Sequence, residues 1–272
     1  MVELHYDVSG KGPVLLVVPG GAGHPMGLDR MTDVLAERFT VVTYDPLGLA
    51  HGRLGEPVGD QRVEEWSDGA RLVLDEVLPE GGSACALGTS SGGIAVLDLL
   101  TRHSERLRHV VAHEPPCVGV LPDGARQQVM FREVYDTYRA AGPQAAGARL
   151  GAGLTGSEPG QYTEPPQPIT CEQELANPMA LFLARVLRQF TSYAPDLTAL
   201  RESSVRLTLA AGSDSRGHLL HRTARFLAEQ TGRGFAEFPG GHIGIAEHPV
   251  AFAELLAETL VPAADSHAPL TT

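Results

Sequence analysis

Short apolar runs alternate with helix-like segments through most of this sequence, and this alternation limits the possible folds more than any other feature. The apolar runs are 13–18, 40–44, 84–87, 107–112, 205–210 and 234–238. The helix-like segments are 28–38, 63–78, 92–103, 219–230 and 249–260. Such alternation is typical of parallel strands joined by crossover helices that cover both faces of a sheet. Residues 2–8, in which apolar and polar side chains alternate, predict an antiparallel edge strand.

Residues 117–203 interrupt this alternation because they contain no strand-like run. They predict helices at 124–140 and 172–193, separated by a stretch rich in glycine and proline at 151–168. A helical insertion of this kind is expected above the carboxyl ends of the strands, as a lid. The expected organisation is a core domain of residues 1–116 and 204–262, a helical cap at 117–203 and a disordered tail at 263–272.

Charge and cysteine content narrow the classes of partner. The 272 residues carry a formal charge of −12 with Lys11 as the only lysine, which argues against nucleic acid or an anionic membrane. Cys85, Cys117 and Cys171 lack the C-x-x-C spacing of a zinc site or a disulfide framework. The sequence starts without a signal-peptide pattern and has no run of the ~18 apolar residues that span a bilayer. We therefore expect a cytoplasmic protein whose substrate is a small neutral or hydrophobic molecule.

The pentapeptide Gly-Thr-Ser-Ser-Gly at 88–92 lies between the apolar run 84–87 and the helix-like segment that follows. Strand, G-x-S-x-G and helix in this order form a nucleophile elbow, which makes Ser90 the candidate nucleophile. Glycines at both ends of the motif remove Cβ atoms where strand and helix approach each other. In a chain with 31 glycines the motif alone could equally be a flexible loop, so further residues must support it.

A serine nucleophile needs a histidine base and a carboxylate that orients the histidine. His242 follows the apolar run 234–238 in a Pro-Gly-Gly-His segment, where a loop would hold it over the edge of the sheet. Two carboxylates also follow predicted strands, Asp214 after 205–210 and Glu114 after 107–112. The chain order Ser90, Asp214, His242 is the one expected for a nucleophile elbow of this type, so Asp214 is favoured over Glu114.

Two backbone N–H groups must face the oxygen that becomes negative during the reaction. Ser91 supplies one, and Gly21, in the glycine-rich loop after the run 13–18, is our choice for the other. The apolar stripes of the two predicted cap helices indicate an apolar pocket beneath the cap. The candidate substrate-binding residues are His24, Met130, Tyr135 and Phe182.

In their joint order these motifs resemble the α/β-hydrolase superfamily over about residues 2–260. The resemblance implies a mostly parallel eight-stranded sheet with helices on both faces, a helical cap between strands 6 and 7, and catalysis without a cofactor. It also implies that Ser90 is the nucleophile, His242 the base and Asp214 the acid, with Gly21 and Ser91 forming the oxyanion hole. No histidine spacing points to a metal. Serine at the elbow argues against haloalkane dehalogenases and epoxide hydrolases, where aspartate is expected.

The resulting hypothesis is a serine hydrolase that acts on a carboxylic ester or lactone with apolar groups through an acyl-enzyme. The same residues also suit amides, thioesters and carbon–carbon bonds next to a carbonyl, and the sequence does not separate these substrates. Two other classes stay open. One is a lyase or cyclase on the same scaffold, and the other is a protein that binds a small molecule without turning it over.

Overall fold

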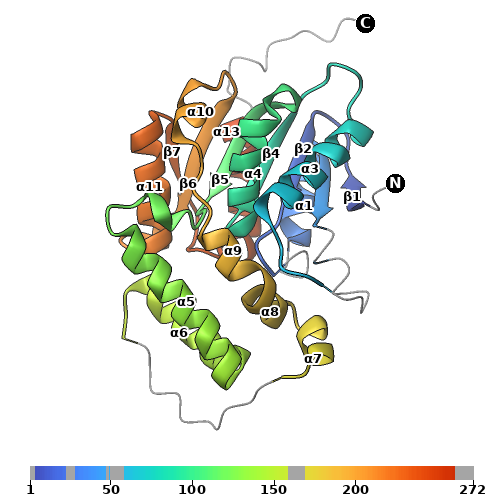
Figure 1. Ribbon diagram of the computed structural model, residues 1–272. Coiled ribbons are helices and arrows are strands. Elements are labelled where there is room, and N and C mark those ends of the chain that lie inside the picture. The colour runs from blue at the N-terminus through green and yellow to red at the C-terminus, as the bar shows by residue number, and fades with distance from the viewer. Residues whose placement is uncertain (1–3, 23–27, 47–48, 50–57, 159–168, 261–272) are drawn as a thin grey trace, which may run out of the picture.

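The computed structural model describes residues 4–22, 28–46, 49, 58–158 and 169–260. The tail expected at 263–272 lies outside these described residues. A single sheet forms the centre of the molecule (Figure 1). Its strands are β1 (His5–Ser9), β2 (Val14–Val18), β3 (Thr40–Asp45), β4 (Ala84–Thr89), β5 (Leu107–His113), β6 (Arg206–Gly212) and β7 (Gly234–Phe238).

The strands lie in the order β1-β3-β2-β4-β5-β6-β7, and only the pairing of β1 with β3 is antiparallel. This confirms the mostly parallel sheet and its antiparallel edge strand. The described residues form seven strands rather than the eight that the resemblance implied. Strands β2 and β4 are buried almost throughout. Because helices cover both of their sides, these strands are continuously apolar instead of alternating.

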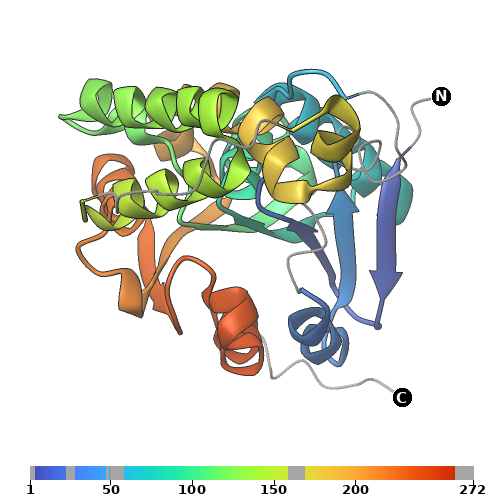
Figure 2. The same ribbon diagram turned by 90° about the horizontal axis from the view of Figure 1, so that it is seen from below.

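Helices cover the sheet on both faces. One core cluster joins the sheet to α3 (Val63–Val77), α4 (Ser91–Arg102) and α11 (Leu219–Thr231). A second cluster lies on the other face with α1 (Asp29–Ala36) and α13 (Pro249–Leu260), which lie next to each other beneath the sheet in Figure 2. Among the described residues, no helix is both long enough and apolar enough to cross a bilayer.

A helical segment separates β5 from β6, at the position where residues 117–203 were expected to form a cap. Its main helices are α5 (Gly124–Ala141), α6 (Pro143–Thr155), α7 (Cys171–Ala176), α8 (Pro178–Leu181), α9 (Leu187–Thr191) and α10 (Leu197–Glu202). A π-helical turn at Phe182–Val186 joins α8 to α9. Figure 1 shows α5, α6, α7 and α8 beyond one end of the sheet. Among the seven strands that the described residues form, the insertion follows the fifth, whereas the resemblance implied the sixth.

The helices of this insertion differ in part from those expected. The helix expected at 124–140 is confirmed as α5. The single helix expected at 172–193 is interrupted, because the Asn177 side chain caps a new helix by accepting hydrogen bonds from the N–H groups of Met179 and Ala180. Part of the glycine- and proline-rich stretch at 151–168 belongs to helix α6, which has proline in its first turn and ends at Gly156 in the left-handed conformation.

The parallel register brings the carboxyl ends of the central strands together. Thr89 of β4 lies beside His113 of β5, and His113 lies beside Ala210 of β6. The residues that directly follow these strands, Ser90 and Glu114, are therefore close neighbours although they are far apart in the sequence. α10 leads back to β6 at the opposite end of the sheet (Figure 1).

Two histidines of β5 are buried in the sheet. Burial, together with the positive charges of Arg206 and Arg108, lowers the pKa of His109 to about 4. His113 is fully buried against the rings of Phe238 and Phe252, and burial also lowers its pKa to about 4. Both side chains are therefore neutral in the folded protein at pH 7, whereas exposed histidines titrate near pH 6.5.

The lowered pKa values of His109 and His113 predict that the protein becomes less stable as the pH falls. Between about pH 6.5 and pH 4 the unfolded chain takes up protons that the folded chain excludes, so the free energy of unfolding is expected to fall as the pH decreases. Each histidine contributes a slope of up to about 1.4 kcal/mol per pH unit in this range. Urea denaturation at pH 7.5, 6.0 and 5.0 measures the slope. His113→Leu should make it shallower, and His248→Gln, a change at an exposed position, should not. An equal slope in wild type and His113→Leu contradicts the prediction.

Candidate active site

Ser90 lies on the sharp turn between β4 and α4, with a φ of 52° and a ψ of −119°. The turn is so tight that a Cβ on Gly88 would lie 2.2 Å from the Gly92 carbonyl oxygen. A Cβ on Gly92 would lie equally close, 2.2 Å, to the carbonyl oxygen of Val18. Only glycine fits at either position, as the motif predicts. The Ser90 N–H donates to the His113 carbonyl at 2.9 Å, which fixes the turn to the next strand.

The His242 ring contacts the carboxylate of Glu114. Nδ1 of His242 lies 2.8 Å from Oε2 of Glu114, whose side chain is 1% exposed. The other oxygen, Oε1, accepts from the N–H of Gly212 at 3.0 Å and from the Ser215 hydroxyl. Burial alone would raise the pKa of Glu114, but the hydrogen bond to His242 and the charge of that ring outweigh it and lower the pKa to about 2. Glu114 is therefore ionised and accepts a hydrogen bond from His242. Nδ1 of His242 carries the proton of this hydrogen bond.

Asp214, which we expected to orient His242, does not occupy this place. It lies in the short 3-10 turn Ser213–Ser215 after β6 and is exposed. Its carboxylate accepts from the Ser213 hydroxyl at 3.3 Å, and its N–H donates to the carbonyl of Gly240. The loop that carries Asp214 still serves the site, because Ser215 and the Gly212 N–H from this part of the chain bind Glu114. The partner of His242 is thus the carboxylate that we ranked second.

The backbone of Glu114 explains how a residue one position past β5 reaches His242. Apart from Ser90, Glu114 is the only non-glycine residue with a positive φ among the described parts of the chain, at 46°. This left-handed turn redirects the chain as it leaves the sheet, and the Glu114 N–H holds it by donating to the Ala210 carbonyl at 2.8 Å. A left-handed glutamate gives no signal in the sequence, although the Pro-Pro pair that follows it marks an abrupt end of the strand.

Gly21 and Ser91, the two expected oxyanion donors, lie close to each other beside Ser90. A Cβ on Gly21 would be 3.0 Å from the Ser91 hydroxyl oxygen, and one on the preceding Gly20 would be 3.5 Å from Cβ of Ser90. Ser91 is the first residue of α4 and is 1% exposed. Its N–H has no acceptor within the first turn of that helix, which leaves it available to an oxygen bound at Ser90.

A mostly apolar cavity of about 160 Å³ lies above these groups. Ser90, Ser91, Gly21 and His242 all line it. Its apolar walls come largely from the inserted helices and from the segment directly after His242. These wall residues are Phe131, Leu150, Leu154, Met179, Phe182, Leu187, Leu220, Ile243 and Ile245. Ser90, His242 and the two positions expected to supply donors therefore border one small, mostly apolar chamber.

Comparison with known proteins places this arrangement in a family. Residues 14–255 match the Alpha/beta hydrolase family. The chain belongs to this family. It is similar to the uncharacterized hydrolase YraK of Bacillus subtilis (strain 168), with 30% identity over 263 residues that cover 95% of this chain and 92% of the relative.

Two solved structures share the fold of this alpha/beta hydrolase. The enol-lactonase from Burkholderia xenovorans LB400 superposes with a TM-score of 0.61 at 17% identity, over 94% of this chain and 96% of the other. A thermophilic esterase from Thermogutta terrifontis superposes with a TM-score of 0.66 at 17% identity, over 94% of this chain and 92% of the other. The family membership and the named relatives make the protein an alpha/beta hydrolase enzyme.

Of the three residues expected to contact substrate that the structure describes, one lines the chamber of this alpha/beta hydrolase. Phe182 lies in its wall. Met130 points instead into a second cavity, and the ring of Tyr135 lies under the guanidinium of Arg188 at 4.5 Å. His24 is outside the described residues. Phe131, next to Met130 on α5, takes the place in the chamber wall that was expected for Met130.

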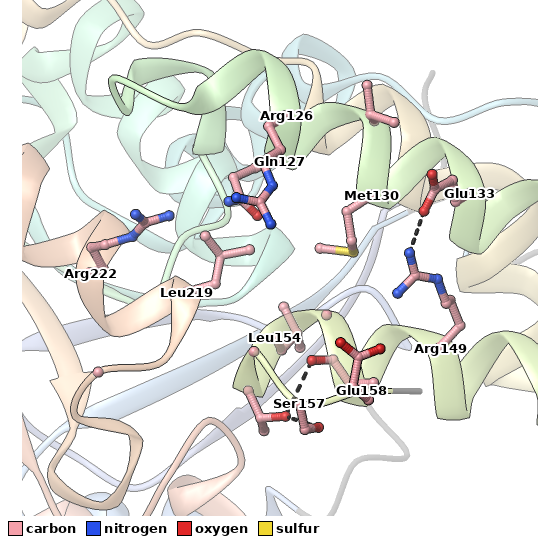
Figure 3. Close-up of a pocket in the computed structure, with 16 residues that line it drawn as sticks. Arg126, Gln127, Met130, Glu133, Arg149, Leu154, Ser157, Glu158, Leu219 and Arg222 are labelled. Carbon is pink, nitrogen blue, oxygen red and sulfur yellow. Dashed lines mark hydrogen bonds and ion pairs between the residues drawn. The ribbon is translucent and has the colours of Figure 1, made fainter. Parts of the chain in front are cut away.

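The second cavity, of about 580 Å³, lies between α5, α6 and the start of α11 (Figure 3). Side chains of both charges line it, among them Arg126, Glu133, Arg149, Glu158 and Arg222. Arg149 and Glu133 form an ion pair, and Arg222 pairs with Asp123. Leu154 lines this cavity as well as the chamber above Ser90, so a thin apolar wall separates the two.

The contact between Glu114 and His242 predicts that replacing Glu114 and replacing Asp214 have different effects on turnover in this alpha/beta hydrolase. Glu114→Gln removes the ionised acceptor and is expected to lower turnover of p-nitrophenyl acetate by ~10³- to 10⁴-fold with little change in KM. Asp214→Asn, a matched change in an exposed carboxylate, is expected to alter turnover less than about threefold. Steady-state kinetics of both purified variants, with thermal melting to confirm folding, measures the difference. A larger loss for Asp214→Asn would contradict the assignment of Glu114.

Proposed function

We propose that this alpha/beta hydrolase cleaves carboxylic esters or lactones with apolar groups, and that Ser90 forms an acyl-enzyme. The observation that carries the proposal is that Ser90 and His242 line one apolar chamber, and that His242 is hydrogen-bonded to Glu114. The printed names of the two solved structures, an esterase and an enol-lactonase, are consistent with this bond type. The small volume of the chamber suits a compact substrate, since sites for drug-sized ligands begin at about 300 Å³.

The histidine acts first as a base. Glu114 accepts the proton on Nδ1, so Nε2 of His242 is left with a free lone pair. Nε2 takes the hydroxyl proton as the Ser90 oxygen attacks the carbonyl carbon. The carbonyl oxygen becomes negative and accepts hydrogen bonds from the N–H groups of Gly21 and Ser91, each worth ~10²- to 10³-fold in turnover.

The histidine then acts as an acid and a second time as a base. His242 returns the proton to the alkoxide oxygen, the carbon–oxygen bond to it breaks, and the acyl group stays on Ser90. A water molecule loses its proton to Nε2 and attacks the acyl carbon. The bond between that carbon and the Ser90 oxygen then breaks, and Nε2 returns the proton to this oxygen, which releases the carboxylic acid and the free serine. The ionised Glu114 stabilises the imidazolium in both halves without taking up its proton.

The inserted helices act in this proposal as the lid of the chamber. Phe131, Leu154 and Phe182 come from α5, α6 and the π-helical turn, and their side chains keep bulk water away from Ser90. Exclusion of water strengthens the hydrogen bonds to the developing negative charge. It also selects substrates whose groups next to the carbonyl are apolar.

Covalent labelling tests the nucleophile. A fluorophosphonate is expected to add to wild type with a stoichiometry of one, seen by intact-protein mass spectrometry, and peptide mapping should find it on Ser90. Ser90→Ala is expected to lose both the label and at least ~10³-fold of its ester hydrolysis. Ser91→Ala is the matched control, because it keeps the backbone N–H and should still be labelled.

The outcomes of this experiment are distinct. Label or turnover that survives Ser90→Ala would overturn the assignment of the nucleophile. Labelling of Ser90 without hydrolysis of any ester in a panel of chain lengths would refute the ester and lactone substrate while leaving an activated serine.

A further inference from the structure

The ring of Phe182 lies directly on Gly21. A Cβ built on Gly21 would lie 2.1 Å from Cδ2 and 2.5 Å from Cε2 of this ring, far inside van der Waals contact. Gly21 does not have a left-handed φ, so its backbone conformation would accept alanine. Glycine is therefore required at this position because the Phe182 ring leaves no room for a side chain, and not because of the backbone conformation. The aromatic ring occupies the volume that any other residue would need.

The π-helical turn Phe182–Val186 brings Phe182 to this place. A π turn holds one more residue than an α-helical turn, and such turns are frequent at functional sites. The turn is held from the core side because the Gln61 N–H donates to the Arg185 carbonyl at 2.8 Å. It is also held from within the insertion, where Nε of Arg185 donates to Glu174 at 2.9 Å and the same carboxylate accepts from Tyr138.

Glu174 makes this second attachment firm because it is 7% exposed and has a hydrogen-bond donor on each oxygen. Side chains that are buried and fully hydrogen-bonded hold their neighbours in one arrangement. Phe182 is thus a ring on a fixed support and not a loosely placed side chain. Its edge lies beside Ser91 and Gly21, and its ring forms part of the chamber wall.

We propose that Phe182 determines which substrates enter, by filling the space beside the reacting carbonyl, and that it positions the loop of Gly21 for binding the oxyanion. This inference rests on the proposed ester or lactone hydrolysis. The inference adds a substrate class to that proposed function, namely compounds with short groups next to the carbonyl. Phe182 donates and accepts no proton, so it is a specificity and positioning residue.

Four proteins test the contact: wild type, Gly21→Ala, Phe182→Ala and the double variant. Their kcat/KM values are measured with p-nitrophenyl acetate, butyrate and octanoate. Gly21→Ala keeps the backbone N–H but displaces either the Phe182 ring or the loop of Gly21. We therefore expect kcat/KM to fall by ~10- to 100-fold with every ester. In the Phe182→Ala background, Gly21→Ala should lower kcat/KM by less than about threefold, because the ring that the alanine would contact is absent.

Phe182→Ala alone tests the specificity. The ratio of kcat/KM for octanoate to that for acetate is expected to rise at least ~10-fold. Phe131→Ala is the matched control: it removes an equal side chain from the same chamber wall, yet the atoms nearest to a Cβ on Gly21 belong to Phe182 and Ser91. It should not relieve the effect of Gly21→Ala.

Each contrary result has one meaning. An equal loss from Gly21→Ala with and without Phe182 would refute the positioning role. An unchanged ratio in an active Phe182→Ala would refute the specificity role. If wild type reacts with neither the esters nor a fluorophosphonate, the proposed function fails and the specificity role fails with it. Thermal melting of the same four proteins would still report the contact, because Gly21→Ala should lower Tm in wild type and not in Phe182→Ala.

Discussion

The buried carboxylate of Glu114 is the interaction on which the arrangement of the site depends. It joins three segments that the sequence separates widely: its own position just past β5, the Gly212–Ser215 segment at the end of β6, and the loop of His242 after β7. A carboxylate with so little exposure is stable only when its charge is compensated, and removal of one partner would leave it uncompensated at a cost of several kcal/mol. The same contacts that keep Glu114 ionised therefore hold the histidine over the sheet.

Strain accompanies this arrangement. Ser90 and Glu114 are the two non-glycine residues with positive φ in the described parts of the chain, and they lie side by side at the ends of β4 and β5. Such conformations cost on the order of 1–3 kcal/mol each and persist only when their surroundings fix them. Here each N–H donates to a carbonyl of the neighbouring strand, Ser90 to His113 and Glu114 to Ala210. The parallel sheet supplies the rigid frame, and its ladder continues one residue past each strand to hold the turn.

Local pattern was sufficient for the fold and for the placement of Ser90, Gly21 and His242, because apolar runs, glycine spacing and turns are properties of neighbouring residues. Glu114 could not be ranked above Asp214 in that way. Which carboxylate reaches His242 depends on the register between strands and on one left-handed residue, and neither is encoded locally. The break at Asn177 could have been read from its Asn-Pro pair, whereas the π-helical turn, which places Phe182, left no comparable signal.

Leu154 borders two cavities that differ in size and polarity. On one side of this leucine is the mostly apolar chamber of about 160 Å³, and on the other is the charged cavity of about 580 Å³. Because Leu154 borders both, shortening its side chain would thin the wall between the chamber and a larger cavity that carries arginines and carboxylates. This one position therefore bears on which substrate groups fit above Ser90, without any change in Ser90, His242 or Glu114.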